Sequence, residues 1–201
     1  MKRVFILVMV LALVLMASQT WAQARKSQIE LFGGVAIPLA PDAFKDYFKV
    51  GGSLHGQYVI FPSPTLGISF GVAVEGFTFD GDKLLQDLGF SGSGVTVEGS
   101  ASVVELGVGL RPYLTQPEAN TQFFLFGMGT YNLLSTESKV SGFGESYSSK
   151  DDTNKFGVAA GAGFELPAGE KINIIIQGLT RFIFTENETT SFVGITGGVV
   201  F

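Results

Sequence analysis

The sequence has no cysteine and a single histidine, and these shortages exclude several kinds of site. Without cysteine there is no disulfide framework and no thiolate metal site. One histidine among scattered carboxylates gives no metal-ligand spacing. None of the glycine-rich stretches continues as Gly-Lys-Ser/Thr into a helix, so no phosphate-binding loop is predicted. We therefore expect neither a metal nor a cofactor.

Long apolar runs are also missing after residue 24, which argues against a transmembrane helix. The one uninterrupted apolar run, residues 4–16, follows Lys2 and Arg3 and precedes Ala22-Gln23-Ala24. A basic start, a short apolar run and an A-x-A site are typical of a secretory signal peptide. The pattern predicts a signal peptide over residues 1–24 and one domain over 25–201. A cut after Ala22 and an uncleaved anchor helix stay open as alternatives.

Basic residues are few as well. Without Lys2 and Arg3, eleven basic residues face eighteen acidic ones, a formal charge of −7. No cluster of lysine and arginine offers the positive surface that nucleic-acid binding needs. We expect no nucleic-acid partner.

Glycine, in contrast, is abundant, with 27 residues that all follow residue 24. The glycines are interleaved with Val, Ile, Leu and Phe, as in residues 157–164, whereas a disordered linker would have low hydrophobicity. Small residues alternating with apolar ones indicate β-strands with one face made of small side chains.

Period-two alternation recurs along the chain, and helical periodicity is weak, with at most a short helical turn at 83–88. In the fourth segment, residues 95–113, the apolar residues move from one strand face to the other near Val103, which predicts a bulge there. In the fifth, both faces are apolar and the orientation stays open. The eight segments are 27–38, 48–61, 65–79, 95–113, 121–134, 154–166, 171–185 and 190–201.

The connections differ in length. Those at 62–65, 114–120 and 167–170 are short and contain proline, and 186–189 is short and polar. Those at 39–47, 80–94 and 135–153 are longer and charged. Short turns at one end and long loops at the other are typical of outer-membrane barrels, and within hydrocarbon only helices and closed barrels pair every backbone group. The sequence predicts an all-β fold, an eight-stranded antiparallel up-and-down transmembrane β-barrel.

One face of each strand would then meet lipid, and the other would fill a narrow lumen. Charges in a dry lumen are costly unless they are paired, so we expect both inward arginines to pair with inward glutamates. Aromatic residues near both ends of the segments predict two interfacial girdles. The predicted polar network of the lumen comprises Glu30, His55, Glu75, Glu105, Arg111, Glu165 and Arg181.

Three stretches resemble the outer-membrane barrel family that includes OmpX and the transmembrane domain of OmpA. They are residues 155–167, Arg111-Pro112-Tyr113 followed by 124–129, and the terminal 194–201. The resemblance implies a place in the outer membrane and contact with its lipid and lipopolysaccharide. It also implies insertion by periplasmic chaperones and the barrel assembly machinery. Val199 and Phe201 would form the C-terminal assembly signal, with Val199 where an aromatic residue is often found.

Fold alone does not determine activity, and four functions stay open. The leading one is a non-enzymatic, monomeric envelope barrel with a structural or adhesin-like role, in which loop 135–153 contacts a surface. A lipid A-modifying enzyme would need a hydroxyl beside a base, and Ser53 lies two residues from the single histidine, His55, on the same strand face. A narrow pore and a soluble periplasmic lipid-binding barrel complete the alternatives. We expect no enzymatic activity.

Overall fold

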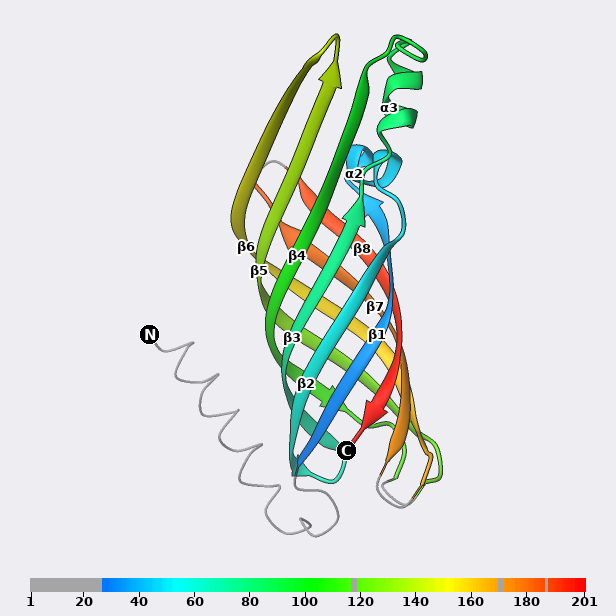
Figure 1. Ribbon diagram of the computed structural model, residues 1–201. Coiled ribbons are helices and arrows are strands. Elements are labelled where there is room, and N and C mark those ends of the chain that lie inside the picture. The colour runs from blue at the N-terminus through cyan, green and yellow to red at the C-terminus, as the bar shows by residue number, and fades with distance from the viewer. Residues whose placement is uncertain (1–26, 117–118, 170–171, 187) are drawn as a thin grey trace, which may run out of the picture.

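The computed structural model describes residues 27–116, 119–169, 172–186 and 188–201; the predicted signal peptide lies outside these residues. Within these ranges eight antiparallel strands close into a barrel in which each strand pairs with its neighbours in sequence and β1 pairs with β8 (Figure 1). This confirms the predicted fold class. The strands are β1 (Ser27–Ala40), β2 (Gly51–Ser63), β3 (Leu66–Thr78), β4 (Thr96–Pro112), β5 (Gln122–Gly142), β6 (Glu145–Pro167), β7 (Asn173–Phe184) and β8 (Thr189–Val200).

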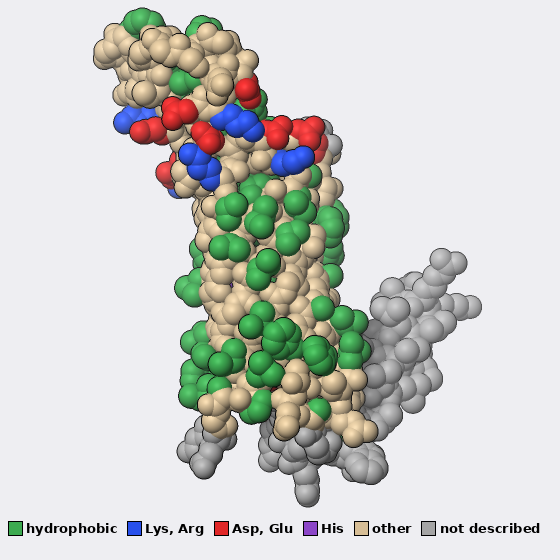
Figure 2. All heavy atoms as spheres, turned by 90° about the vertical axis from the view of Figure 1, so that its right-hand side faces the viewer, with side chains coloured by type: hydrophobic (Ala, Val, Ile, Leu, Met, Phe, Trp, Pro, Cys, Tyr) green, Lys and Arg blue, Asp and Glu red, His purple; other side chains and the backbone are tan. Residues whose placement is uncertain are grey.

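Alternation along each strand separates the two faces of the barrel wall. In β1, Leu31 and Val35 are exposed on the outside, while Glu30 and Ala36 are buried in the lumen. The other strands follow the same rule, so apolar side chains cover the outside (Figure 2). In β5 the open orientation is settled, with Phe124 and Phe126 in the lumen. A soluble barrel that binds a lipid inside would place its apolar face inward, so this arrangement argues against that alternative.

Strand β4 corrects one expectation. The bulge predicted near Val103 is wrong, because β4 pairs in continuous register with β3 from Ser100 to Pro112 and with β5 from Thr96 to Leu110. Val97 lies on the inward face, where its carbonyl closely approaches Gly81 of the helix α3 (Gly81–Asp87). Above the membrane the outer face meets water, so an apolar residue there is buried best on the inner face.

The segment 135–153 is also not the polar loop that its composition predicts. Strands β5 and β6 continue in register as far as Gly142 and Glu145, with only Phe143 and Gly144 between them. Together with the start of β4, this hairpin extends well past the other strands (Figure 1). Its polar residues obscure the period-two pattern, because both of its faces meet water.

Two short helices lie at the same end of the barrel, α2 (Asp42–Tyr47) and α3. The Asp80 side chain accepts a hydrogen bond from the Lys83 backbone N–H and thereby caps the start of α3. Helix α2 was not expected from the sequence. Among the described residues, no helix is long and apolar enough to cross a membrane.

Closure depends on the last strand. Ile29 and Phe201 exchange two backbone hydrogen bonds, at 3.2 and 2.9 Å. Ile195 and Phe201 are exposed on the outer face and Val200 is buried, which is the orientation that counting back by two from Phe201 predicts.

The aromatic residues divide differently from the two predicted girdles. Some face outward near the ends, among them Tyr58, Phe123, Tyr131, Phe156 and Phe184. Four others that also lie near strand ends, Phe61, Phe77, Tyr113 and Phe192, are buried inside the barrel and do not belong to a girdle. Position near a strand end predicts depth in the membrane, but the parity of the residue decides which face it occupies.

Candidate functional site

The lumen contains a polar layer near the end where the chain terminates, centred on Arg111 of β4. Its guanidinium donates to both carboxylate oxygens of Glu30, to Oε2 at 2.8 Å, and to Oε1 of Gln57 at 2.6 Å. A second carboxylate, that of Glu165, lies 3.9 Å from Nη1 and accepts hydrogen bonds from the Tyr113 hydroxyl at 2.5 Å and from Gln28 at 3.2 Å. The layer links β1, β2, β4 and β6 across the lumen.

A second polar layer, centred on Arg181 of β7, lies nearer the other end. Nε of Arg181 donates to Oε2 of Glu105 at 2.8 Å and Nη2 donates to Oε1 at 3.3 Å. Nη1 lies 3.0 Å from Oε1 of Glu75, and the same oxygen lies 3.2 Å from Nε2 of His55. Four strands, β2, β3, β4 and β7, therefore contribute to this layer.

The two layers have the same design of one arginine and two glutamates. Each guanidinium also lies over a phenylalanine ring, Arg111 at 4.5 Å from the centroid of Phe124 and Arg181 at 5.5 Å from that of Phe192. All seven residues of the predicted network are buried, and the structure brings them together as these two groups. Bidentate arginine–carboxylate pairs with low exposure fix the orientation of both partners.

Apolar side chains fill the lumen between and above the polar layers. One cluster includes Phe32, Phe126, Met128 and Leu179, and a second, at the mouth, includes Phe77 and Phe192, whose rings lie 5.4 Å apart. Phe44 of α2 packs edge-on against Phe77 at 5.0 Å. An interior in which the described side chains are packed in this way argues against the narrow pore.

The Ser53 and His55 pair does not form the contact that a lipid A-modifying enzyme would need. Among the described residues the Ser53 hydroxyl has no hydrogen-bond partner. His55 faces Glu75 in the closed lumen and is 3% exposed. A nucleophile has to be hydrogen-bonded to its base and reachable by substrate, and this geometry supplies neither. In the described part of the chain no group of three potential ligands is arranged to hold a metal ion.

On the outer face of the barrel, the side chains of the long strands change from apolar to charged along the strand. On β5, Tyr131 and Leu133 are followed on the same face by Glu137 and Lys139. Acidic and basic side chains gather in a belt above the apolar surface (Figure 2). This change indicates that the membrane surface lies between Leu133 and Glu137, because lipid-facing charges are costly near the middle of the bilayer.

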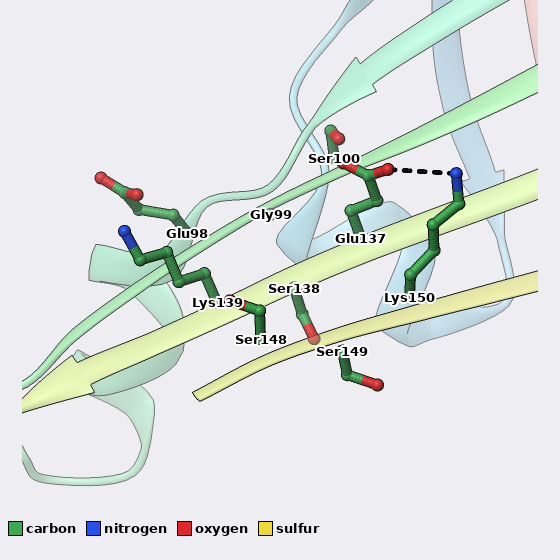
Figure 3. Close-up of a pocket in the computed structure, with 9 residues that line it drawn as sticks. All are labelled: Glu98, Gly99, Ser100, Glu137, Ser138, Lys139, Ser148, Ser149 and Lys150. Carbon is green, nitrogen blue, oxygen red and sulfur yellow. Dashed lines mark ion pairs between the residues drawn. The ribbon is translucent and has the colours of Figure 1, made fainter. Parts of the chain in front are cut away.

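Charge pairs lie on and below the extension, which is the upper part of the β5–β6 hairpin together with the start of β4. Lys150 lies opposite Glu137 in the register and pairs with it at 3.3 Å (Figure 3). Near the base of the extension, Lys155 donates to Glu186 at 2.9 Å, and this ammonium group lowers the pKa of Glu186. A shallow groove of about 450 Å³ runs over this face between Glu98 and Lys150. Its exposed pairs contribute little stability each, but they keep the face polar.

The tip of the extension is apolar again. Phe143 is 90% exposed and Tyr147 is 73% exposed. Phe143 has a φ of +54°, and Gly144, which follows it in the turn, has a φ of +85°. A bulky residue rarely adopts a positive φ, and Asn or Gly is the usual choice in such a turn. The chain therefore holds an aromatic ring in water at some cost in backbone strain. Sequence reasoning missed this site, although Phe143-Gly144 between polar runs was the available signal.

No model of a known protein family matches the chain, and neither does any curated protein. Solved structures do match. A major outer membrane protein from Thermus thermophilus is 12% identical over 88% of this chain and 99% of that chain, with a TM-score of 0.54. Ail, the attachment invasion locus protein of Yersinia pestis, is 13% identical over 88% and 100%, with a TM-score of 0.49. Neisserial surface protein A is 9% identical over 87% and 95%, also at 0.49.

The likeness to the Thermus protein shows a shared barrel fold, and at 12% identity it shows the fold alone. The chain therefore has the architecture of the small outer-membrane barrels, in agreement with the resemblance to OmpX and the OmpA transmembrane domain.

Proposed function

We propose that this protein is a non-enzymatic, monomeric barrel of the outer membrane and that its β4–β6 extension contacts a surface outside the cell. The observation that carries the proposal is the tip of the extension, where Phe143 in the turn and Tyr147 beside it are exposed to water. Exposed aromatic residues are enriched where proteins bind partners, and strain kept in a turn points to a role for the residue that bears it.

The barrel supports this role as a rigid anchor. The described side chains pack the lumen and the outside is apolar, so the barrel suits a rigid support for the extension better than a route for transport. The extension itself is an ordered sheet, since β4 pairs with β5 from Thr96 and β5 pairs with β6 up to the turn. An ordered sheet presents its tip at a defined height with little loss of conformational entropy on contact.

The location and the route of assembly belong to the same proposal. The apolar outside, ended by a polar belt, suits one membrane-spanning barrel, and the lysines of that belt, such as Lys139 and Lys150, would contact lipopolysaccharide phosphates. Delivery by periplasmic chaperones and insertion by the barrel assembly machinery would use the terminal strand with Val199 and Phe201.

Trimming the hairpin tests the proposal. Glu137 and Lys150 lie opposite each other, so residues 138–149 can be replaced by an Asn-Gly turn without altering the register below. Bacteria displaying the wild-type or the trimmed protein are compared for adhesion to epithelial cells and to immobilised matrix proteins. We expect the trimmed protein to lose most of the adhesion that the wild type confers.

A matched control keeps the extension and removes only the aromatic tip, as Phe143→Ser with Tyr147→Ser. Heat-modifiable migration on gels checks that both variants still form the barrel. Adhesion that is unchanged in both variants would exclude the extension as the contact surface.

A further inference from the structure

The mouth of the barrel contains a pocket of about 300 Å³ that the anchoring role does not use. One wall is α2 with Phe44 and Phe48 at its end, and the opposite wall is the inner face of β4 and β5, with Val103 and Leu134. Phe77 belongs to the floor, where it packs against Phe44 and Phe192. The pocket is therefore built from elements far apart in the sequence.

The lining determines what such a pocket accepts. Of the described residues that line it, none is charged; most are aromatic or aliphatic, and the hydroxyl groups of Thr136 and Thr190 stand among them. An apolar pocket with a few polar groups is the usual form of a small-molecule site, and 300 Å³ is at the lower end of the size range. An apolar cavity of about 150 Å³ already admits benzene, so one ring with a short substituent fits.

The position of the pocket favours a ligand from outside the cell over a membrane lipid. Ala101, Val103 and Leu134 reach it from the inner face of the wall, so the wall itself separates the pocket from the surrounding acyl chains. Strand β7 ends at Phe184 and β8 begins at Thr189, both lower than the extension, which leaves the mouth accessible from outside (Figure 1).

We propose that this mouth pocket (the residues around Phe44, Phe48, Val103 and Leu134) binds an uncharged small molecule with one aromatic ring and a hydrogen-bonding group. The rings of Phe44, Phe48 and Phe77 supply edge-to-face contacts. A hydroxyl of the ligand would reach Thr136 or Thr190. Charged aromatic molecules are rejected, because the lining offers no ion-pair partner among its described residues.

Benzyl alcohol is the probe for this proposal. The full protein is placed in phospholipid nanodiscs with ¹³C-labelled Leu and Val methyl groups, and the probe is titrated by NMR. Leu134 lines the pocket, whereas its neighbour Leu133 faces lipid. Binding predicts saturable shifts of Leu134 and Val103, while dissolution of the probe in the bilayer gives unsaturable shifts that are as large at Leu133.

Ala101→Phe fills the pocket with an apolar ring and should raise the Kd for benzyl alcohol at least tenfold. Ala162→Phe, on the lipid face of β6, is the matched control. Thr136→Phe lies in the extension above the barrel and provides a second way to fill the pocket if Ala101→Phe does not fold. Benzoate tests the requirement for an uncharged ligand and should produce no saturable shift. Equal shifts at Leu133 and Leu134, or saturation that survives both filled variants, would overturn the proposal.

Discussion

At the scale of single residues, the two lumen arginines matter most, because each balances buried carboxylates. Arg111 and Glu30 are almost completely buried and form a two-point contact. Breaking such a pair leaves a charge in a dry interior, which costs more than the pair itself contributes.

Arg111→Met is therefore expected to destabilise the folded barrel by about 3–5 kcal/mol. Urea unfolding in bilayers, followed by the loss of heat-modifiable migration, measures the effect. Adding Glu30→Gln to the same chain should recover part of it, since one stranded charge is then removed. Lys150→Met, which breaks an exposed pair, should cost no more than about 1 kcal/mol. A cost as small for Arg111→Met would contradict the proposed importance of the polar layer around Arg111.

Glycine has a different role on the two faces of the wall. A Cβ added to the inward Gly161 would collide with the carbonyl oxygen of Gly178 and lie 2.8 Å from the Phe126 ring. A Cβ added to the outward Gly178, on the neighbouring strand, meets no described atom within 4 Å. Close packing of the lumen therefore depends on the missing side chain at Gly161.

Gly161→Val should prevent correct folding or destabilise the barrel by at least about 3 kcal/mol, because overpacking displaces backbone as well as side chains. Gly178→Val should fold and remain heat-modifiable, since its side chain projects into lipid. Equal yields of folded protein for the two variants in refolding experiments would refute this explanation of the inward glycines.

At the scale of elements, the β5–β6 hairpin passes through two environments, the membrane and the water above it. Its lower part alternates between lipid and lumen, whereas its upper part has water on both faces and carries charge on the outside. The pairing is continuous through this change. Backbone pairing that continues from the barrel thus keeps this segment ordered, although the segment buries little apolar surface of its own.

Substitutions of Phe143 in the turn of the hairpin can separate the effect of backbone strain from the effect of the exposed ring on adhesion. Phe143→Asn should stabilise the hairpin tip by about 1 kcal/mol, because Asn tolerates the positive φ that strains Phe. Slower amide hydrogen exchange near Gly142 and Glu145 is the measurement. The same variant should weaken adhesion, since the exposed ring is gone.

Phe143→Ala is the control for that substitution, because it removes the ring but keeps a side chain ill suited to the turn. It should weaken adhesion without slowing exchange. Faster exchange in Phe143→Asn than in the wild type would contradict the assignment of strain.

At the scale of the whole molecule, the lumen is a stack of alternating polar and apolar layers beneath an aromatic mouth. Arg111, the Phe32 cluster, Arg181 and the Phe77–Phe192 pair follow one another along the barrel. An eight-stranded barrel has an interior only wide enough for side chains, and here large ones occupy it.

We therefore expect no steady conductance when the purified protein is inserted into planar bilayers. Phe77→Ala with Phe192→Ala should also stay closed, because the two arginine layers lie below the mouth. An outer-membrane porin inserted in the same way checks the method. Stable current steps from the wild-type protein would show that the lumen opens.

Much of this architecture follows from the sequence alone. Two environments, lipid and the lumen contents, meet opposite faces of each strand, so period-two alternation is enough to assign Glu30, Glu75, Arg111 and Arg181 to the inside. The number of strands and the closure at Phe201 follow from the same alternation and from the turns.

The tertiary structure alone decides the rest. Arg111 and Glu30 are 81 residues apart, and which glutamate meets which arginine depends on the stagger of strands across a closed ring. The extension lies beyond the membrane, and the mouth pocket lies at its base, at the level of the membrane surface. Water on both sides of the extension removes the difference between the two strand faces on which period-two alternation depends. The form of the extension and of the pocket is set by backbone pairing continued from the barrel and by the packing of α2 over its mouth.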